Sequence, residues 1–133
     1  MPSHKKIILL LLLLLSSAFA EVTNEYASQA IIDSKIPIVD IRTPDEWRET
    51  GLIKGAIPIM FFTPEGKYDV NKFLTELNAK VDTKKPFALI CRTGSRTKLV
   101  AAFLDKELHY PVTDLVGGMM IVDAKRLPKD TYK

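Results

Sequence analysis

Four short apolar segments constrain the fold of this chain more than any other feature of its sequence. They run from Pro37 to Ile41, Ile57 to Met60, Phe87 to Ile90 and Val112 to Leu115, and each is too short for a helix. Their hydrophobicity is continuous instead of alternating, which is typical of strands buried on both faces of a parallel sheet. We therefore predict a strand at each of these segments.

Helical patterns lie between and around these strands. Apolar residues recur at helical spacing from Val70 to Val81 and from Leu99 to Leu108. A helix start is predicted at Thr43 to Glu46, where a threonine cap, a proline in the first turn and an acidic residue form a capping box. Residues 26–31 suggest an opening helix. Strands that alternate with helices predict an open α/β sheet covered on both faces, with its active site beyond the carboxyl ends of the strands.

Residues 1–20 have the pattern of a secretory signal peptide. Two lysines precede an apolar run from Ile7 to Leu15, and small residues at Ala18 and Ala20 precede the first acidic residue, Glu21. The uncharged stretch has fourteen residues, fewer than the ~20 that cross a bilayer. We expect cleavage after Ala20, a single domain at residues 21–133 and a periplasmic or secreted protein without stable membrane insertion. An uncleaved leader is the alternative.

Composition excludes several classes of partner and site. A hydrophobic content of 47% excludes a disordered chain. Beyond the leader, Lys and Arg number 17 against 16 Asp and Glu, with no basic stripe, so we expect no nucleic-acid partner. The single cysteine, Cys91, excludes a disulfide framework and zinc sites of the CxxC kind, and no metal or cofactor is expected. In an exported protein, a lone cysteine is a reactive thiol, an intermolecular link or a buried hydrophobe.

The residues that follow Cys91 favour a reactive thiol. Cys91 comes directly after the predicted strand at 87–90, and Gly94 lets the backbone bend back over the sulfur. Backbone N–H groups of residues 92–97 are then expected to converge on the sulfur, together with the positive end of the next helix. Such donors stabilise a thiolate without a histidine base. His109, the only histidine beyond the leader, is assigned no role.

Two arginines flank the predicted thiolate. Charged side chains are usually solvated, but Arg92 and Arg96 bracket this loop, so we expect them to recognise a small oxyanion.

Four motifs in sequence order resemble those of a single-domain rhodanese, a thiosulfate sulfurtransferase, here in an exported form. They are Val39 to Arg42 followed by Pro44 to Trp47, Gly51 to Ala56, Cys91 to Thr97, and Leu115 to Gly118. The resemblance implies an open, mainly parallel sheet of about five short strands with helices on both faces. It also implies that Cys91 attacks the outer sulfur of thiosulfate, expels sulfite and becomes a persulfide. An unidentified thiol or protein acceptor then takes that sulfur.

The resemblance also implies roles for the residues around Cys91. The loop that follows it would cradle the persulfide and the small anionic sulfur donor, through Arg92, Thr93, Gly94, Ser95, Arg96 and Thr97. Asp40 and Arg42 would lie near the site, either supporting the loop or forming a purely structural salt bridge.

Three positions depart from the family pattern. Leu52 replaces the histidine usual after the first glycine of its motif, a change expected to affect packing more than chemistry. Val122 stands where an aromatic residue often follows the double glycine, so the C-terminal helix is expected to pack differently. Thr93 stands where thiosulfate-using members often carry a second basic residue. This last change weakens the assignment of thiosulfate but leaves the persulfide unaffected.

Two other functions remain alternatives at this stage. A cysteine phosphatase or arsenate reductase also holds a thiolate in an anion cradle, but places arginine six positions after the cysteine, whereas Arg96 is five after Cys91. The smaller ring suits a single sulfur atom better than phosphate. A non-enzymatic sulfur carrier or persulfide relay partner would need the same loop. A disulfide oxidoreductase is disfavoured because the chain has no resolving cysteine.

Overall fold

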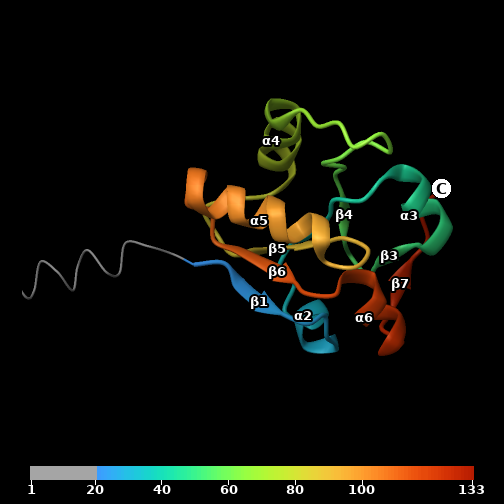
Figure 1. Cartoon of the computed structure of the whole chain (residues 1–133). Coiled ribbons are helices and arrows are strands. Elements are labelled where there is room, and N and C mark those ends of the chain that lie inside the picture. Colours follow the sequence, from blue (N-terminus) through green and yellow to red (C-terminus); the bar gives the residue numbers. More distant parts are fainter. Residues whose placement is uncertain (1–20) are drawn as a thin grey trace, which may run out of the picture.

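The central element of the computed structural model, which describes residues 21–133, is a five-stranded parallel sheet (Figure 1). Its strand order is β1-β6-β5-β2-β4, and every neighbouring pair is parallel. The strands are β1 Thr23–Glu25, β2 Ile38–Asp40, β4 Ile57–Pro58, β5 Phe87–Ile90 and β6 Val112–Leu115. A separate antiparallel pair joins β3 Leu52–Ile53 to β7 Lys129–Asp130. The predicted signal peptide, residues 1–20, lies outside the described residues.

Helices cover both faces of this sheet, which confirms the predicted α/β class. They are α2 Gln29–Asp33, α3 Pro44–Thr50, α4 Val70–Lys80, α5 Ser95–Leu108 and α6 Gly118–Ala124. Buried residues of α4 and α5 join one hydrophobic cluster, and those of α2 and α6 join a second one. Figure 1 shows α4 and α5 on the opposite side of the sheet from α2 and α6. Within residues 21–133, no helix is long and apolar enough to cross a membrane.

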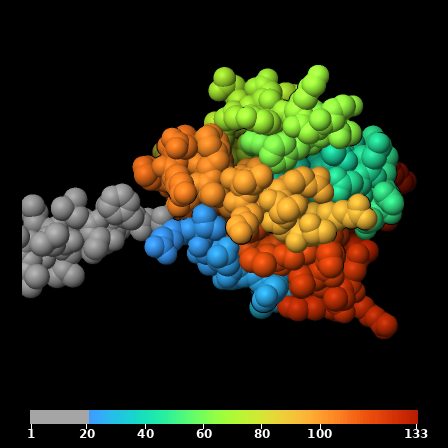
Figure 2. Space-filling view, in the orientation of Figure 1, coloured from blue at the N-terminus to red at the C-terminus, as the bar shows by residue number. Residues whose placement is uncertain are grey.

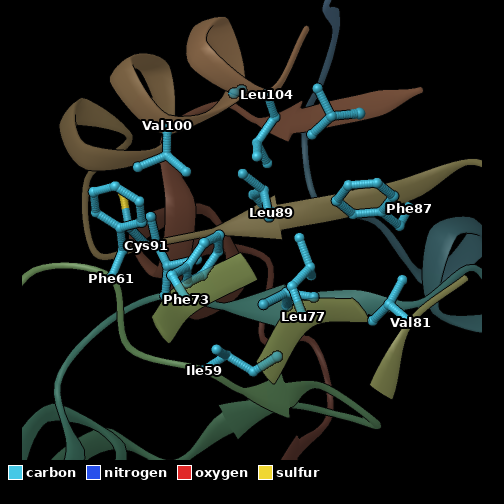
Figure 3. Close-up of a cluster of buried hydrophobic side chains, with 14 residues drawn as sticks. Ile59, Phe61, Phe73, Leu77, Val81, Phe87, Leu89, Cys91, Val100 and Leu104 are labelled. Atoms are coloured by element: carbon cyan, nitrogen blue, oxygen red, sulfur yellow. The ribbon is translucent and has the colours of Figure 1, made fainter. Parts of the chain in front are cut away.

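The central position of β5 in the sheet explains why its sequence is continuously apolar. Phe87 and Leu89 pack into the cluster beneath α4 and α5, whereas Ala88 and Ile90 pack into the cluster on the other face. Because side chains alternate between the faces of a strand, a strand buried on both faces has no polar position. Cys91 continues the face of Phe87 and Leu89 and belongs to the same cluster (Figure 3).

The helix start predicted at Thr43 is confirmed. The Thr43 hydroxyl accepts a hydrogen bond from Glu46 N, the Glu46 carboxylate accepts one from Thr43 N, and Pro44 is the first helical residue of α3. This capping box satisfies two of the N–H groups that a helix leaves without partners at its start. It also fixes the Glu46 side chain beside the carboxyl edge of the sheet.

Candidate active site

Cys91 lies fully buried at the carboxyl end of β5, among the apolar side chains that Figure 3 shows around it. Its Sγ accepts a hydrogen bond from Gly94 N at 3.2 Å and lies 3.5 Å from Thr97 Oγ1. Gly94 has a φ of 100° and caps α5, so the chain turns sharply and brings the start of this helix to the sulfur. The N-terminal end of a helix dipole favours a negative charge at this place.

Fewer backbone amides donate hydrogen bonds to the Cys91 sulfur than the sequence predicts. Of the N–H groups of residues 92–97, Gly94 N alone donates a hydrogen bond to Sγ within the described part of the chain. The cradle of residues 92–97 around a transferred sulfur stays a prediction, of which the thiol form shows one donor.

A second turn supports the backbone of this loop from the side of α6. The carbonyl oxygen of Cys91 accepts a hydrogen bond from Met119 N at 2.9 Å, and that of Arg92 accepts one from Met120 N at 3.2 Å. A Cβ atom on Gly118 would lie 2.2 Å from the Cys91 oxygen, so only glycine permits this approach. The double glycine at the start of α6 thus holds the Cys91 loop, residues 91–97, in place.

Arg96 is not free to recognise an oxyanion, contrary to the expectation from sequence. Its guanidinium makes two parallel hydrogen bonds to the Glu46 carboxylate, at 2.7 and 2.8 Å. This pairing, partly opposed by desolvation, lowers the pKa of Glu46 to about 2. The same hydrogen bonding raises the pKa of Arg96. Because α3 places Glu46 beside the start of α5, the ion pair links these two helices instead of leaving a free cation.

A cavity of about 680 Å³ opens over the start of α5, where α5 adjoins the segment around residues 60–66 (Figure 2). Arg92, Ser95 and Arg96 of the Cys91 loop line it, and so does Leu99. Arg92 is exposed and forms no salt bridge within residues 21–133. Thr93 is also exposed but does not line the cavity. The cation available to a ligand at this mouth is therefore Arg92.

Asp40 and Arg42 form the structural salt bridge, one of the two roles expected for them. The Arg42 guanidinium lies 2.8 Å from the Asp40 carboxylate, and both side chains are almost fully buried. Arg42 also donates to Thr50 Oγ1 and to the Gly51 carbonyl, both at 2.7 Å. Trp47 Nε1 donates to Asp40 at 3.1 Å. Within residues 21–133 the pair makes no hydrogen bond to the Cys91 loop, so it joins β2 to α3.

Comparison with known proteins identifies the family. The model of the rhodanese-like domain matches residues 23–124. The chain belongs to the rhodanese-like domain family. Its buried cysteine at a strand end is followed by a helix and supported by a double glycine, which brings two of the motifs found in the sequence together.

Individual relatives of this rhodanese-like domain are distant. The putative sulfurtransferase YtwF of Bacillus subtilis is 26% identical over 98 residues, which cover 74% of this chain and 84% of that protein. The uncharacterized protein RP600 of Rickettsia prowazekii is 30% identical over 77 residues, 56% of this chain and 61% of that protein's length. The polysulfide-sulfur transferase homodimer of Wolinella succinogenes has the same fold, with a TM-score of 0.63 at 19% identity over 97% of this chain and 93% of that one.

Two of the three positions that depart from the family pattern, Leu52 and Val122, have packing roles in this rhodanese-like domain. Leu52 is buried and pairs in β3 with Asp130 of β7. Val122 is fully buried in the cluster between the sheet and α6. His109 caps the C-terminus of α5 with a φ of 55°. Within the described residues, no group of three or more His, Cys, Asp and Glu side chains could hold a metal ion.

One buried acidic residue beside the Cys91 loop is not marked by any of the sequence motifs. Asp114, in the middle of β6, is 5% exposed, and its Oδ1 has no hydrogen-bond partner within the described residues. Burial raises the pKa of Asp114, while the neighbouring Thr97 hydroxyl and the Lys98 ammonium lower it in part. A signal was present, because an acidic residue interrupts the otherwise buried segment from Val112 to Leu115. Thr97 is thus near both Asp114 and Sγ of Cys91.

Proposed function

We propose that this rhodanese-like protein is a sulfurtransferase that carries sulfur as a persulfide on Cys91. The Cys91 thiolate attacks the outer sulfur of thiosulfate, or of a related persulfide donor. A new S–S bond forms to Sγ, and the S–S bond of the donor breaks. Sulfite, or the donor thiolate, leaves with the electron pair. A thiol or another thiophilic acceptor then attacks the outer sulfur, and the Cys91 thiolate is released.

The observation that carries this proposal is the position of the single thiol. Sγ of Cys91 accepts the Gly94 amide at 3.2 Å, directly below the start of α5, in a domain of the rhodanese-like family. An amide hydrogen bond and a helix N-terminus both favour the anionic form of sulfur over the neutral form. The kinship with a putative sulfurtransferase, over most of both chains, supports the same reaction class.

The charges at the cavity mouth bear on the choice of donor. Glu46 neutralises Arg96, and Asp45 is paired with Arg48, so Arg92 is the cation left for an anionic donor. Thiosulfate carries two negative charges, whereas a persulfide of a thiol carries one on its reacting group. We therefore propose that persulfides of thiols are used at least as well as thiosulfate.

Intact mass spectrometry tests the persulfide directly. The protein is incubated with thiosulfate and, separately, with the persulfide of a small thiol, and its mass is measured before and after treatment with a reductant. We expect a gain of one sulfur atom that the reductant removes, and no gain in the Cys91→Ser variant. Absence of a gain with both donors would contradict the proposal. Because Sγ is buried, loading is expected to be slow compared with the reaction of a free thiol.

A sulfur carrier is the second candidate, and the burial of Cys91 favours it. A sulfur held below the loop is protected from solvent and from casual acceptors, which suits storage as well as turnover. Steady-state release of sulfite from thiosulfate with a simple acceptor such as cyanide would support the enzyme. A single stoichiometric load without turnover would support the carrier. Turnover of p-nitrophenyl phosphate above that of thiosulfate would support a phosphatase instead.

Export to the periplasm or the medium is also part of the proposal. It rests on the basic, apolar and small-residue pattern of residues 1–20. The same mass measurement, on protein recovered from cells, reports whether this segment has been removed after Ala20.

A further inference from the structure

Asp114 is a buried carboxyl group whose place in the fold the proposed reaction leaves unexplained. It is 5% exposed, and Oδ1 has no hydrogen-bond partner within the described residues. In the sheet, Asp114 is in register with Leu89 of β5, two residues before Cys91. Its carboxyl group and Sγ of Cys91 therefore lie on the α5 side of two adjacent strands. Buried polar groups are usually satisfied, so this one calls for a reason.

The Thr97 hydroxyl stands between Asp114 and the sulfur. Thr97 is fully buried in the first turn of α5, and its Oγ1 lies 3.3 Å from the Gly94 carbonyl oxygen and 3.5 Å from Sγ of Cys91. The same hydroxyl is close enough to Asp114 to lower the pKa of that carboxyl group. A hydroxyl has one proton to donate. It cannot serve the carbonyl, the sulfur and the carboxylate at the same time.

We infer that Asp114 is a positioning residue that controls, through the Thr97 hydroxyl, how strongly the negative charge on the Cys91 sulfur is stabilised. When the Asp114 carboxyl group is protonated, its O–H can donate to Thr97 Oγ1, and the Thr97 proton is free to turn to the sulfur. When Asp114 is ionised, it attracts the Thr97 proton and places a like charge near the thiolate. Ionised Asp114 therefore opposes the thiolate form of Cys91, and protonated Asp114 does not.

The groups around Asp114 leave few other charges to consider. β6 packs against β1, β5 and α5. At the level of Asp114, β1 contributes Asn24 and β5 contributes Leu89, neither of which titrates. Helix α5 contributes Lys98, whose ammonium group favours the ionised carboxylate, and burial opposes it more strongly.

The test is the pH profile of alkylation at Cys91, which needs no sulfur donor. The chain has one cysteine, so the uptake of iodoacetamide reports this thiol alone. In Asp114→Asn, the amide donates to Thr97 Oγ1 at every pH and carries no charge. We expect the midpoint of the profile to move down by about one pH unit, so that alkylation at pH 6 is about tenfold faster. The midpoint, unlike the plateau rate, does not depend on how often the loop opens.

Two further backgrounds separate the route through Thr97 from a simple effect of charge. In Thr97→Val, which has no hydroxyl, we expect the effect of Asp114→Asn to fall to about threefold, the part that acts through space. In Thr97→Ser, which keeps the hydroxyl, we expect the full effect. Asp33→Asn, on the exposed surface of α2, removes the same charge far from the loop and is expected to leave the profile unchanged.

The outcomes distinguish this inference, which rests on the proposed function, from that function itself. An unchanged midpoint in Asp114→Asn overturns the inference, and so does an equal shift in the Thr97→Val and wild-type backgrounds. Either result leaves a persulfide on Cys91 intact as a proposal. Conversely, failure to load sulfur onto the protein overturns the proposed function while the alkylation profile still reports the coupling of Asp114 to the thiol. Circular dichroism and thermal melting show that each variant is folded.

Discussion

The two strands that flank β5 each carry a buried aspartate, but the two carboxyl groups have opposite surroundings. Asp40 ends β2, in register with Ile90, whereas Asp114 lies in β6, in register with Leu89. The alternation along β5 places the two on opposite faces of the sheet. Asp40 accepts hydrogen bonds from Arg42 and from the Trp47 indole, whereas Oδ1 of Asp114 has no partner within residues 21–133.

The comparison teaches that partners, not burial, decide what a buried acid contributes. The Asp40 carboxylate accepts hydrogen bonds from Arg42 and Trp47, and these bonds connect β2 to α3. When a buried carboxyl group lacks hydrogen-bond partners, desolvation disfavours its ionised form and raises its pKa. Glu46 is intermediate, because its side chain is 20% exposed and fully paired with Arg96. We therefore expect substitutions of Asp40, Glu46 and Asp114, or of their partners, to change the free energy of unfolding by different amounts.

The largest effect is expected from breaking the Asp40–Arg42 pair. Arg42→Met removes the guanidinium but keeps most of the side-chain volume, which leaves Asp40 charged, buried and without its main donors. We expect a loss of about 3–5 kcal/mol in the free energy of unfolding, measured by urea denaturation at neutral pH. The double variant Asp40→Leu with Arg42→Met removes both charges and is expected to recover part of this loss. If Arg42→Met were as stable as wild type, the Asp40–Arg42 salt bridge would contribute nothing to stability.

The Glu46–Arg96 pair is expected to have a medium effect with a clear dependence on pH. The pKa of Glu46 is lowered to about 2 in the folded state, so the pair stabilises the fold above pH ~4.5 and this stability is lost as the pH falls toward 2. Glu46→Gln, which can still form the capping box, is expected to lose about 2 kcal/mol at pH 7 after allowance for solvent screening. The difference from wild type should vanish near pH 2.

A matched control for Glu46 is the exposed pair on the same helix. Arg48 and Asp45 form a salt bridge at 3.0 Å, with side chains that are 54% and 88% exposed. Asp45→Asn is expected to change the free energy of unfolding by less than about 0.5 kcal/mol. If both variants lost the same stability, the partial burial of Glu46 would have no consequence, and the graded comparison of the three acids would be wrong.

Much of the fold could be predicted from the sequence because local patterns determine it. The four apolar segments include β2, β4, β5 and β6, and the capping box at Thr43 marks the start of α3. Strand β1 was missed because its three residues are polar and exposed, so no hydrophobic pattern marks them. The pair β3 and β7 was missed because each strand has two residues and the pairing spans most of the chain.

The site was harder to predict, because its partners are distant in the sequence. The strand end and glycine turn at Cys91 could be recognised locally, and the structure places the thiol at the predicted edge of the sheet. The partner of Arg96 could not, since Glu46 is fifty residues away and is brought there by the order of the strands. The same holds for Asp114 and Thr97, which lie on different elements. The local sequence indicated which side chains can bind or react. It did not indicate which of them are already paired with another side chain of the protein.

Among the three buried or half-buried acids, Asp114 has the smallest expected effect on stability, and this effect has the opposite sign. Burial raises its pKa, so the folded state holds the proton more tightly than the unfolded state. The carboxyl group therefore contributes most stability below pH ~4, and this contribution is lost as the pH rises through the folded-state pKa. Asp114→Asn cannot ionise, and we expect it to be more stable than wild type by about 1 kcal/mol at pH 7 and equal to it near pH 3.5, measured by urea denaturation at both values. A loss of stability at pH 7 like that of Arg42→Met would mean that Asp114 is a satisfied structural acid, and the contrast between the two sides of β5 would not hold.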